Sequence, residues 1–487
     1  MGMPTQAAEL RYAVRPRVLA KNFGHLCVML GCLTAVPLLL AVFIADSGTV
    51  LRYGIVVAGL LAAGWGLTRI PERRRIQPNE AMTLGVLMFV FSPLLMTFPL
   101  TATGLEFADA LFEAVSGATT TGLSMIENPD VMPQILVFSR AWMQWYGGLG
   151  IVVFSVALVV RPGVSARDMA MPEAPRDAQL GGTHSFYKRL ILLYAAITMV
   201  GVLVLIAGGL SPFSSVCYAL SAVSTGGFAP DHDSMAGLGW VPVVIVTLLT
   251  LLCAIPLSRY LSVRFKGWAQ LWGGMQLWTI LALVLLVSAA LFFLPQGHGL
   301  SWGEHMFHSV VMGVAAQTTS GFSVVDVGAL PPPAKMSLLV SMIIGGGMGS
   351  TAGGIKILRL LILFKVISSI VSRASLSRHA VYQPALGPLR LRDTEIQEAL
   401  VVIILYIGFA VLSWIPFLFY GYDPLDSLFE VISALGTVGL SAGVTGPELP
   451  GVLKGVLCAD MLLGRLEILI WLVVLAPGTW IGRHSEE

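Results

Sequence analysis

Four five-residue segments of the chain have nearly the same sequence: Thr119-Thr120-Thr121-Gly122-Leu123, Ser224-Thr225-Gly226-Gly227-Phe228, Thr318-Thr319-Ser320-Gly321-Phe322 and Gly436-Thr437-Val438-Gly439-Leu440. Each has Thr at its second position, Gly at its fourth, and Leu or Phe at its fifth. The fourth-position glycines are 105, 94 and 118 residues apart, a near-regular spacing that is typical of an internal repeat. The sequence therefore consists largely of four copies of one unit.

The composition places this repeat in a membrane. Of the 487 residues, 56% are hydrophobic and only 11% are charged, which is too apolar for a soluble protein. Ten apolar stretches are long enough to cross a bilayer at about 1.5 Å per residue. They lie near residues 24–44, 52–70, 81–101, 134–160, 187–210, 240–260, 271–294, 334–370, 397–420 and 452–480.

A shorter, moderately apolar segment runs into each of the four Thr-x-Gly turns. These segments, near 107–118, 213–223, 304–317 and 425–435, are too short to span a membrane. Irregular backbone at membrane depth is tolerated only where protein buries it or where it lines a cavity. The pattern therefore predicts an all-α polytopic membrane protein, with four helix–pore helix–helix repeats around a pseudo-fourfold pore and two additional N-terminal transmembrane helices.

The repeat pattern also predicts the domain organisation. Residues 1–76 form the two-helix addition, and the four pore repeats cover 77–176, 177–267, 268–385 and 386–487. A step of 25 residues from the turn glycines of repeats one, three and four reaches Gly147, Gly346 and Gly464, whereas the same step in repeat two reaches Leu252. The segments before the turns align as well, and repeats one and four resemble each other most.

The turns themselves are the candidate binding site. A fourth-position Gly allows backbone conformations that strain other residues, so that carbonyl oxygens can surround an axis and replace the water around a potassium ion. Each preceding half-helix would point the negative end of its dipole at the cavity below. The alternative, small residues that only pack helices, accounts poorly for four such turns. The predicted filter residues are Thr120, Thr121, Gly122, Thr225, Gly226, Gly227, Thr319, Ser320, Gly321, Thr437, Val438 and Gly439.

A second motif, residues 344–356, lies within an apolar stretch that is too long for one simple span. Its six glycines in ten positions each cost a helix roughly 1 kcal/mol relative to Ala, so the helix should break there. A close helix crossing is the alternative. Phosphate-binding and dinucleotide motifs fit poorly, because no strand precedes the glycines. The candidate gate residues are Gly345, Gly346, Gly347, Gly349, Gly353, Gly354 and Lys356.

Few charged or metal-ligating residues stand out elsewhere. Arg465 lies deep in an apolar run, where an ionisable side chain usually faces a bundle interior or water, and pairing with Glu467 or another acid is an alternative. Lys356 could act at the same depth or extend to the membrane surface. Glu304, His305 and His308 have the spacing of a helical metal site but lack a further ligand, so no metal other than potassium at the turns is expected.

Charge distribution predicts the orientation. If the turns face outward, most of the 29 Lys and Arg residues fall on the opposite side, and the positive-inside rule then makes that side, with both termini, cytoplasmic. Acidic residues in the outer loops would concentrate cations at the mouth, although solvated acidic loops are common. No basic patch with interleaved aromatic residues suggests nucleic-acid binding, and no catalytic constellation suggests an enzyme.

The four turns with their marker glycines Gly122, Gly227, Gly321 and Gly439, together with the glycine-rich run and Arg465, resemble the Trk/Ktr/HKT superfamily of potassium transporters over essentially the whole chain. The bacterial Trk-type uptake subunit is the most similar member. The resemblance implies selective potassium uptake across the bacterial inner membrane, gating by the glycine-rich run, and Arg465 as an electrostatic barrier. It also implies a lipid-embedded homodimer and a cytosolic nucleotide-binding regulatory partner, since this chain has no nucleotide-binding domain and is expected to bind no nucleotide.

Two other functions remain as alternatives. A secondary transporter for another cation or small solute would place a site between broken helices at mid-membrane, but such folds usually rest on two repeats rather than four parallel ones. A membrane scaffold would leave the four turns unexplained.

Overall fold

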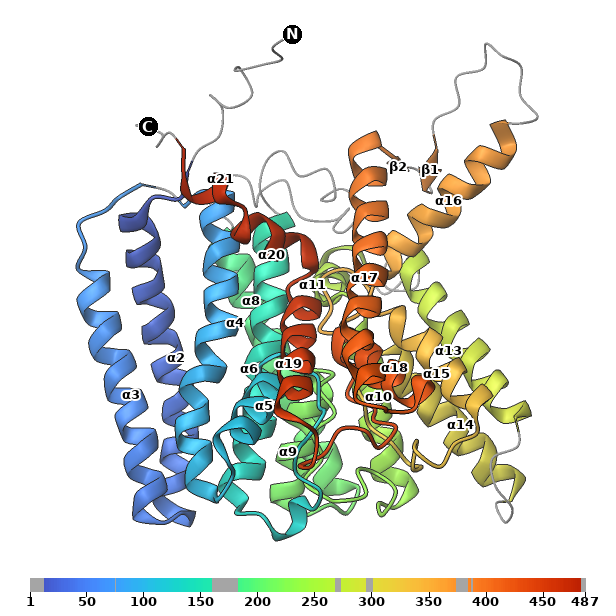
Figure 1. The fold of residues 1–487 in the computed structure, drawn as a ribbon, viewed down its shortest axis with the longest axis horizontal. Coiled ribbons are helices and arrows are strands. Elements are labelled where there is room, and N and C mark those ends of the chain that lie inside the picture. Colours follow the sequence, from blue (N-terminus) through green and yellow to red (C-terminus); the bar gives the residue numbers. More distant parts are fainter. Residues whose placement is uncertain are drawn as a thin grey trace. The chain divides into compact units, whose positions relative to one another are not determined.

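The computed structural model describes residues 13–74, 76–159, 183–267, 273–294, 301–373, 384–386 and 389–482. Within these ranges the regular structure is helical except for two short antiparallel strands, β1 (Ala385–Leu386) and β2 (Leu389–Arg390) (Figure 1). The helices include two 3₁₀ turns, η1 (Thr101–Thr103) and η2 (Pro129–Val131). The predicted all-α fold class is confirmed.

Six described helices are long and apolar enough to cross a membrane. They are α2 (Pro16–Ile44), α3 (Ser47–Thr68), α4 (Pro78–Leu100), α8 (Thr183–Ala207), α13 (Met275–Phe293) and α17 (Asp393–Phe419). A bent pair, α10 (Trp240–Ala254) and α11 (Leu257–Lys266), gives a seventh span if it is counted as one. The N-terminal pair α2 and α3 corresponds to the predicted two-helix addition.

Four shorter helices precede the four turns, where the sequence predicted half-helices. They are α5 (Phe107–Ala118), α9 (Pro212–Val223), α14 (Trp302–Gln317) and α18 (Pro424–Leu435). Their starts follow from local chemistry, because Ser211, Ser301 and Asp423 accept hydrogen bonds from the first free N–H groups of α9, α14 and α18. At 12 to 16 residues, these helices are too short to cross a bilayer.

The helices that follow the turns agree with the prediction in repeats one and three and differ from it in repeats two and four. In repeat one, α6 (Gln134–Val159) is continuous. In repeat two, α10 ends at Ala254, and Pro256, which lacks an N–H, separates it from α11. Repeat three breaks between α15 (Pro332–Ile343) and α16 (Ile357–Arg373), as the glycine run predicts. Repeat four was expected to be one helix, but it divides into α19 (Gly451–Arg465), α20 (Ile468–Leu475) and α21 (Pro477–Trp480).

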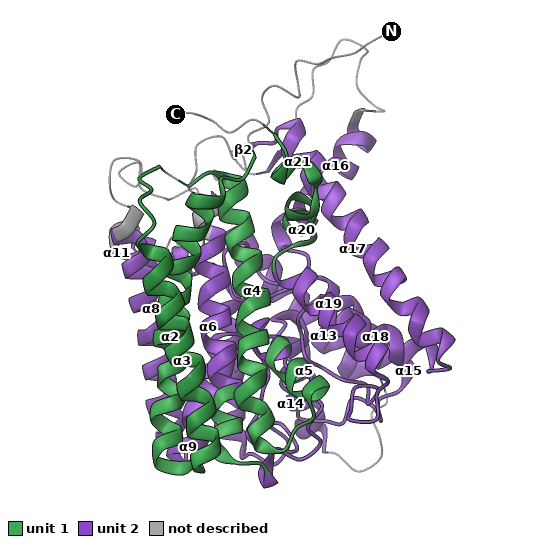
Figure 2. Cartoon of the chain, turned by 60° about the vertical axis from the view of Figure 1, so that its left-hand side comes forward, with its two compact units in different colours: residues 1–115, 132–139, 466–487 green, residues 116–131, 140–465 purple. Residues whose placement is uncertain are grey.

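The chain forms two compact units (Figure 2). Unit 1 comprises residues 1–115, 132–139 and 466–487. Within it, Gly24 and Gly64 let α2 and α3 cross closely, and the buried Arg15 Nε donates to Glu80 Oε1 at 2.8 Å. Unit 2 comprises residues 116–131 and 140–465 and contains all four turns. The four repeat boundaries remain a prediction, and the one at 176/177 lies outside the described residues.

Candidate functional site

Each of the four half-helices ends in the same hydrogen-bonded turn. The N–H of the second turn residue donates to the carbonyl three residues earlier, and the N–H of the third donates five residues back, at 2.8 to 3.3 Å. This is the Schellman motif, whose left-handed residue is usually Gly. Here that residue is always Thr, with φ of 54°, 52°, 53° and 47° in chain order. A left-handed β-branched residue costs roughly 1 to 2 kcal/mol, and a strained conformation that recurs four times points to function.

The fourth-position glycines close the four turns into a ring. They also have positive φ, at 98°, 79°, 68° and 94°. A Cβ atom built on any of them would overlap the third-position carbonyl oxygen of another turn. The pairs, from glycine to oxygen, are Gly122 to Gly226, Gly227 to Ser320, Gly321 to Val438 and Gly439 to Thr121. Turn one thus contacts turn two, two contacts three, three contacts four, and four returns to one.

Such a ring can bind a dehydrated monovalent cation. Backbone carbonyl oxygens that surround an axis take the place of the hydration shell of the ion. The second-position hydroxyls lie in the same turns, and those of Thr120 and Thr437 are fully buried and have no hydrogen-bond partner among the described residues. Burying a hydroxyl group that has no hydrogen-bond partner is unfavourable, because the group gives up its hydrogen bonds to water. Two such oxygens beside the carbonyl ring therefore suit a cation that would use them.

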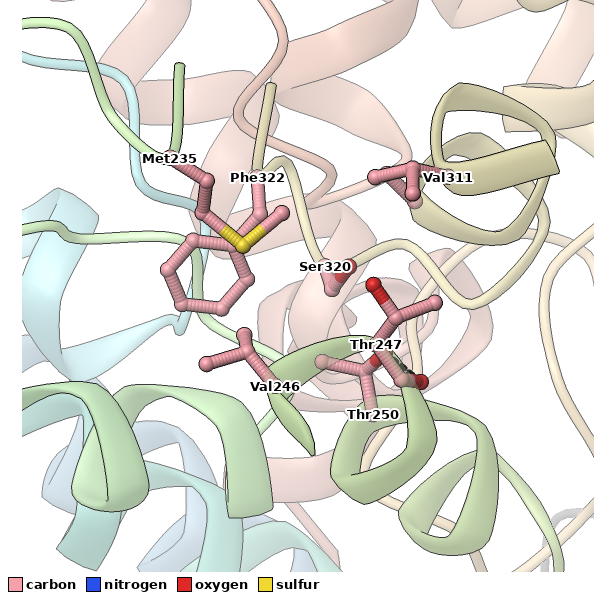
Figure 3. Close-up of a pocket in the computed structure, with 8 residues that line it drawn as sticks. Met235, Val246, Thr247, Thr250, Val311, Ser320 and Phe322 are labelled. Carbon is pink, nitrogen blue, oxygen red and sulfur yellow. Dashed lines mark hydrogen bonds between the residues drawn. The ribbon is translucent and has the colours of Figure 1, made fainter. Parts of the chain in front are cut away.

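Two third-position side chains, those of Thr121 and Ser320, form hydrogen bonds within their own turns. Thr121 Oγ1 lies 2.8 Å from Thr119 Oγ1, and Thr318 Oγ1 donates to Ser320 Oγ at 3.2 Å. Figure 3 shows Ser320 beside a pocket that Thr247 and Thr250 also line. The predicted residues Thr121 and Ser320 therefore contribute backbone carbonyls to the ring, while their hydroxyls support the turn.

Two further contacts fix the turns of repeats one and four. Ser116 Oγ and Ser433 Oγ accept hydrogen bonds from the N–H groups of Gly122 and Gly439, each at 3.0 Å. A Cβ on Gly147 or Gly464 would overlap the carbonyl of Ala118 or Leu435 at the end of the half-helix. The shared glycine of the 25-residue step thus allows close packing in these two repeats.

Repeats two and three depart from this arrangement. In repeat two the equivalent residue is Leu252, whose side chain is 43% exposed. Gly346 lies in the glycine-rich loop, where its nearest neighbours are Ala352, Ala254 and Ser350. The sequence differences among the repeats therefore correspond to different contacts around the ring.

The glycine-rich loop, residues 344–356, lies against the second-position threonines. The N–H of Gly353 donates to Thr319 Oγ1 at 2.7 Å, and Thr225 Oγ1 donates to Thr351 Oγ1 at 3.3 Å. A Cβ on Gly353 would overlap Thr437 Oγ1. The loop therefore contacts three of the four turns at their threonine end.

Backbone hydrogen bonds hold this loop in place. The N–H of Gly345 donates to Ile355 O at 3.0 Å, and that of Gly347 donates to Ala254 O at 3.1 Å. Gln317 on α14 donates to the carbonyl of Ile344 at 2.7 Å. Lys356 is buried and donates to the carbonyl of Ala352, so its ammonium group remains at the loop.

Arg465, at the end of α19, binds the same loop. Its side chain is buried, and its guanidinium group donates to Thr351 O at 2.8 Å and to Gly147 O at 3.4 Å. Among the described residues it has no carboxylate partner, and the buried acid of α19, Asp460, accepts from Ser413 instead, at 2.6 Å. Thr351 therefore links the charged group of Arg465 to Thr225 of the second turn, because it accepts hydrogen bonds from both residues.

The residues that resembled a metal site have other contacts. Glu304 accepts from Ser301 at the start of α14, and these hydrogen bonds lower the pKa of its carboxyl group. A ring nitrogen of His305 lies 2.8 Å from Phe292 O. Within the described ranges, no group of three His, Cys, Asp or Glu residues could hold a metal ion.

Sequence reasoning missed two buried glutamines. Gln144 on α6 contacts the second turn, and Gln317 anchors the glycine-rich loop. An amide in an apolar stretch signals a buried hydrogen-bond partner, but the sequence does not identify that partner. In both cases the bonded residues are distant along the chain.

A membrane-spanning all-α chain in which four turns form one ring of carbonyls has the architecture of an ion-transporting membrane protein. The chain belongs to the TrkH family of cation transport proteins, whose model matches residues 78–261 and 273–478.

Individual proteins are similar over nearly the same length. An uncharacterized cation transporter of Methanocaldococcus jannaschii is 27% identical, with 93% of this chain and 94% of the relative aligned. The Trk system potassium uptake protein TrkH of Halomonas elongata is also 27% identical, over 95% of this chain and 99% of the relative. The crystal structure of the potassium transporter TrkH from Vibrio parahaemolyticus has the same fold, with a TM-score of 0.85, 24% identity, and coverage of 96% of this chain and 100% of that one.

Proposed function

We propose that this chain takes up potassium across the bacterial inner membrane through a selective pore. The closed ring of third-position carbonyls against the turn glycines is the observation that carries the proposal. Potassium is the expected ion because all four turns keep Gly at the fourth position and because carbonyl rings of this kind replace its hydration shell. The names of the Trk system relatives support the same ion.

The glycine-rich loop is the proposed gate. Its contacts with Thr225 and Thr319, and the overlap that any Cβ on Gly353 would make with Thr437, support this role. A loop in this position obstructs the threonine end of the ring, so conduction requires the loop to move. Arg465, bonded to the carbonyl of Thr351, is the proposed electrostatic barrier.

The gate can be tested through the fit of Gly353. We expect Gly353→Ala to raise basal potassium flux, because the added methyl group overlaps Thr437 and Gly436 and prevents the loop from seating. Gly455→Ala, on α19 where no atom lies within 4 Å of the added Cβ, is the control. Flux into liposomes measures both variants. A Gly353→Ala protein with unaltered or lower flux would contradict the gating role.

Orientation and partners complete the proposal. The turns face outward and both termini are cytoplasmic, as the basic residues predict. A homodimer in membrane lipid with a cytosolic nucleotide-binding regulatory subunit is the proposed assembly. The basic segment from Arg373 to Arg392 would dock that subunit, although its residues 374–383 and 387–388 lie outside the described part of the chain.

The central experiment is ion uptake by the purified protein in liposomes. Rubidium or potassium uptake should exceed sodium uptake, and the excess should respond to the cytosolic partner. Protein-free liposomes are the control. A protein that gives no potassium-selective flux, even with the partner added, would refute the proposed function.

A further inference from the structure

Two side-chain contacts recur among the other turns, a serine that accepts the N–H of the turn glycine and a pair of hydroxyl groups, and the second turn has neither. Ser221 has the position that Ser116 and Ser433 have in repeats one and four, six residues before the turn glycine. Those two serines accept the N–H of that glycine, but the hydroxyl of Ser221 has no hydrogen-bond partner among the described residues. The third position is Gly226, which has no side chain to form the hydroxyl pair of Thr119 and Thr121. Local contacts alone would leave this turn weakly held.

A side chain from another repeat supplies the missing support. Gln144, on α6 of repeat one, is fully buried. Its Nε2 donates to Gly226 O, and its Oε1 accepts from the N–H of Phe228 at 3.1 Å. The two bonds therefore bracket Gly227. If the amide were flipped, its oxygen would face Gly226 O and its NH₂ group would face the N–H of Phe228. These two partners therefore determine the orientation of the amide.

The same glutamine explains an exception in the repeated sequence. Gly226 stands where the other turns have Thr, Ser or Val. A Cβ on Gly226 would overlap the carboxamide of Gln144. The amide thus takes the space behind the ring that a third-position side chain occupies elsewhere. Gly226 and Gln144 are complementary, although 82 residues separate them.

We propose that Gln144 is the positioning residue of the second filter turn and that it helps to set ion selectivity. The carbonyl of Gly226, which receives its hydrogen bond, is the oxygen that closes the ring against Gly122. Selectivity for potassium over sodium depends on the size of the carbonyl ring or on the number and field strength of its oxygens, and displacing Gly226 O would change these properties. This inference rests on the proposed potassium pore.

The first test replaces the amide with an apolar side chain of similar size. Gln144→Leu should lower the ratio of potassium to sodium uptake about tenfold, the effect of ~1.4 kcal/mol, because Gly226 O and Phe228 N–H lose their partner. Gln317→Leu is the matched control, since Gln317 is equally buried but binds the glycine-rich loop. It should change total flux and leave the ratio unaltered. Gel filtration and thermal melting would establish that both variants fold.

A gentler series uses the equivalent serines. Ser116→Ala and Ser433→Ala should lower the uptake ratio, because each removes the acceptor for a turn glycine. Ser221→Ala should leave the ratio unchanged, because Gln144 holds that turn. An effect of Ser221→Ala as large as that of Ser116→Ala would overturn the inference. Gel filtration of the three variants would show that each of them folds.

A double variant tests the complementarity directly. Gly226→Ser alone should reduce selectivity through its overlap with Gln144. Adding Gln144→Ala removes the overlap and allows the new hydroxyl to pair with Ser224, as Thr121 pairs with Thr119. The double variant should therefore be more selective than Gly226→Ser. A purely additive result would show that the two positions do not interact.

The outcomes distinguish the role of Gln144 from the proposed function as a potassium pore. Selective wild-type uptake with an unchanged ratio in Gln144→Leu would overturn the role of Gln144 and leave the pore intact. A wild-type protein that does not conduct potassium would overturn the proposed function, and the role of Gln144 would fall with it.

Discussion

Gly439→Ser is expected to reduce potassium-over-sodium selectivity about tenfold or more, which corresponds to at least ~1.4 kcal/mol of lost discrimination. The added Cβ would overlap the carbonyl oxygen of Thr121, and Gly439 has a φ of 94° that disfavours any side chain. The turns must then separate, so that the carbonyls no longer match the ion. Gly122→Ser should act in the same way against Gly226 O. Relative uptake of potassium and sodium in liposomes is the measurement.

Gly443→Ser is the matched control for this prediction. Gly443 has a φ of 92°, yet no atom lies within 4 Å of its added Cβ. Its replacement introduces the same backbone strain without a collision in the ring, so selectivity should persist. Unchanged selectivity in both Gly122→Ser and Gly439→Ser would remove these glycines from the filter.

Arg465→Ala is expected to raise potassium conduction with no change in selectivity. At an effective dielectric constant of 20, a unit charge repels a cation by about 4 kcal/mol at 4 Å and by about 1 to 2 kcal/mol at two to four times that distance. Loss of that repulsion corresponds to a roughly tenfold rise in rate. The buried position of Arg465 and its bond to Thr351 O support the effect.

Two further variants separate charge from hydrogen bonding at this position. Arg465→Gln removes the charge and keeps N–H donors, whereas Arg465→Lys keeps the charge. If the barrier is electrostatic, Gln should resemble Ala, and Lys should resemble the wild type. A fall in conduction in Arg465→Ala would contradict the barrier role. A rise in conduction in Arg465→Ala but not in Arg465→Gln would assign the effect to the lost hydrogen bond between Arg465 and the glycine-rich loop. Current at fixed potassium gradient measures all three.

Sequence reasoning succeeded where the repeat itself carried the information. The half-helices lie within two residues of their predicted bounds, because four aligned copies compensate for the weak signal of any one of them. The break at the glycine-rich loop was also predictable, since local propensity determines it. Repeats one and four, the most similar in sequence, proved to share the serine contact and the packed glycine.

The missed features depend on contacts that hydropathy does not encode. The break before Ile468 falls at Glu467, which has a φ of 62°, and no Gly or Pro lies between Arg465 and Ile468 to mark it in the sequence. Gln144 appeared to be an ordinary residue of an apolar helix, because its partners Gly226 and Phe228 come from the next repeat. Only the fold brings these residues together.

The left-handed threonines have a consequence for assembly. Thr120, Thr225, Thr319 and Thr437 together carry a strain of roughly 4 to 8 kcal/mol, if each costs roughly 1 to 2. That sum is comparable to the net stability of a whole domain, about 5 to 15 kcal/mol. Each turn carries only its own share of this strain, but the ring closes through contacts between different turns, so it should form only when all four repeats have been inserted and packed. An ion that binds the finished ring would then stabilise the folded protein as well as pass through it.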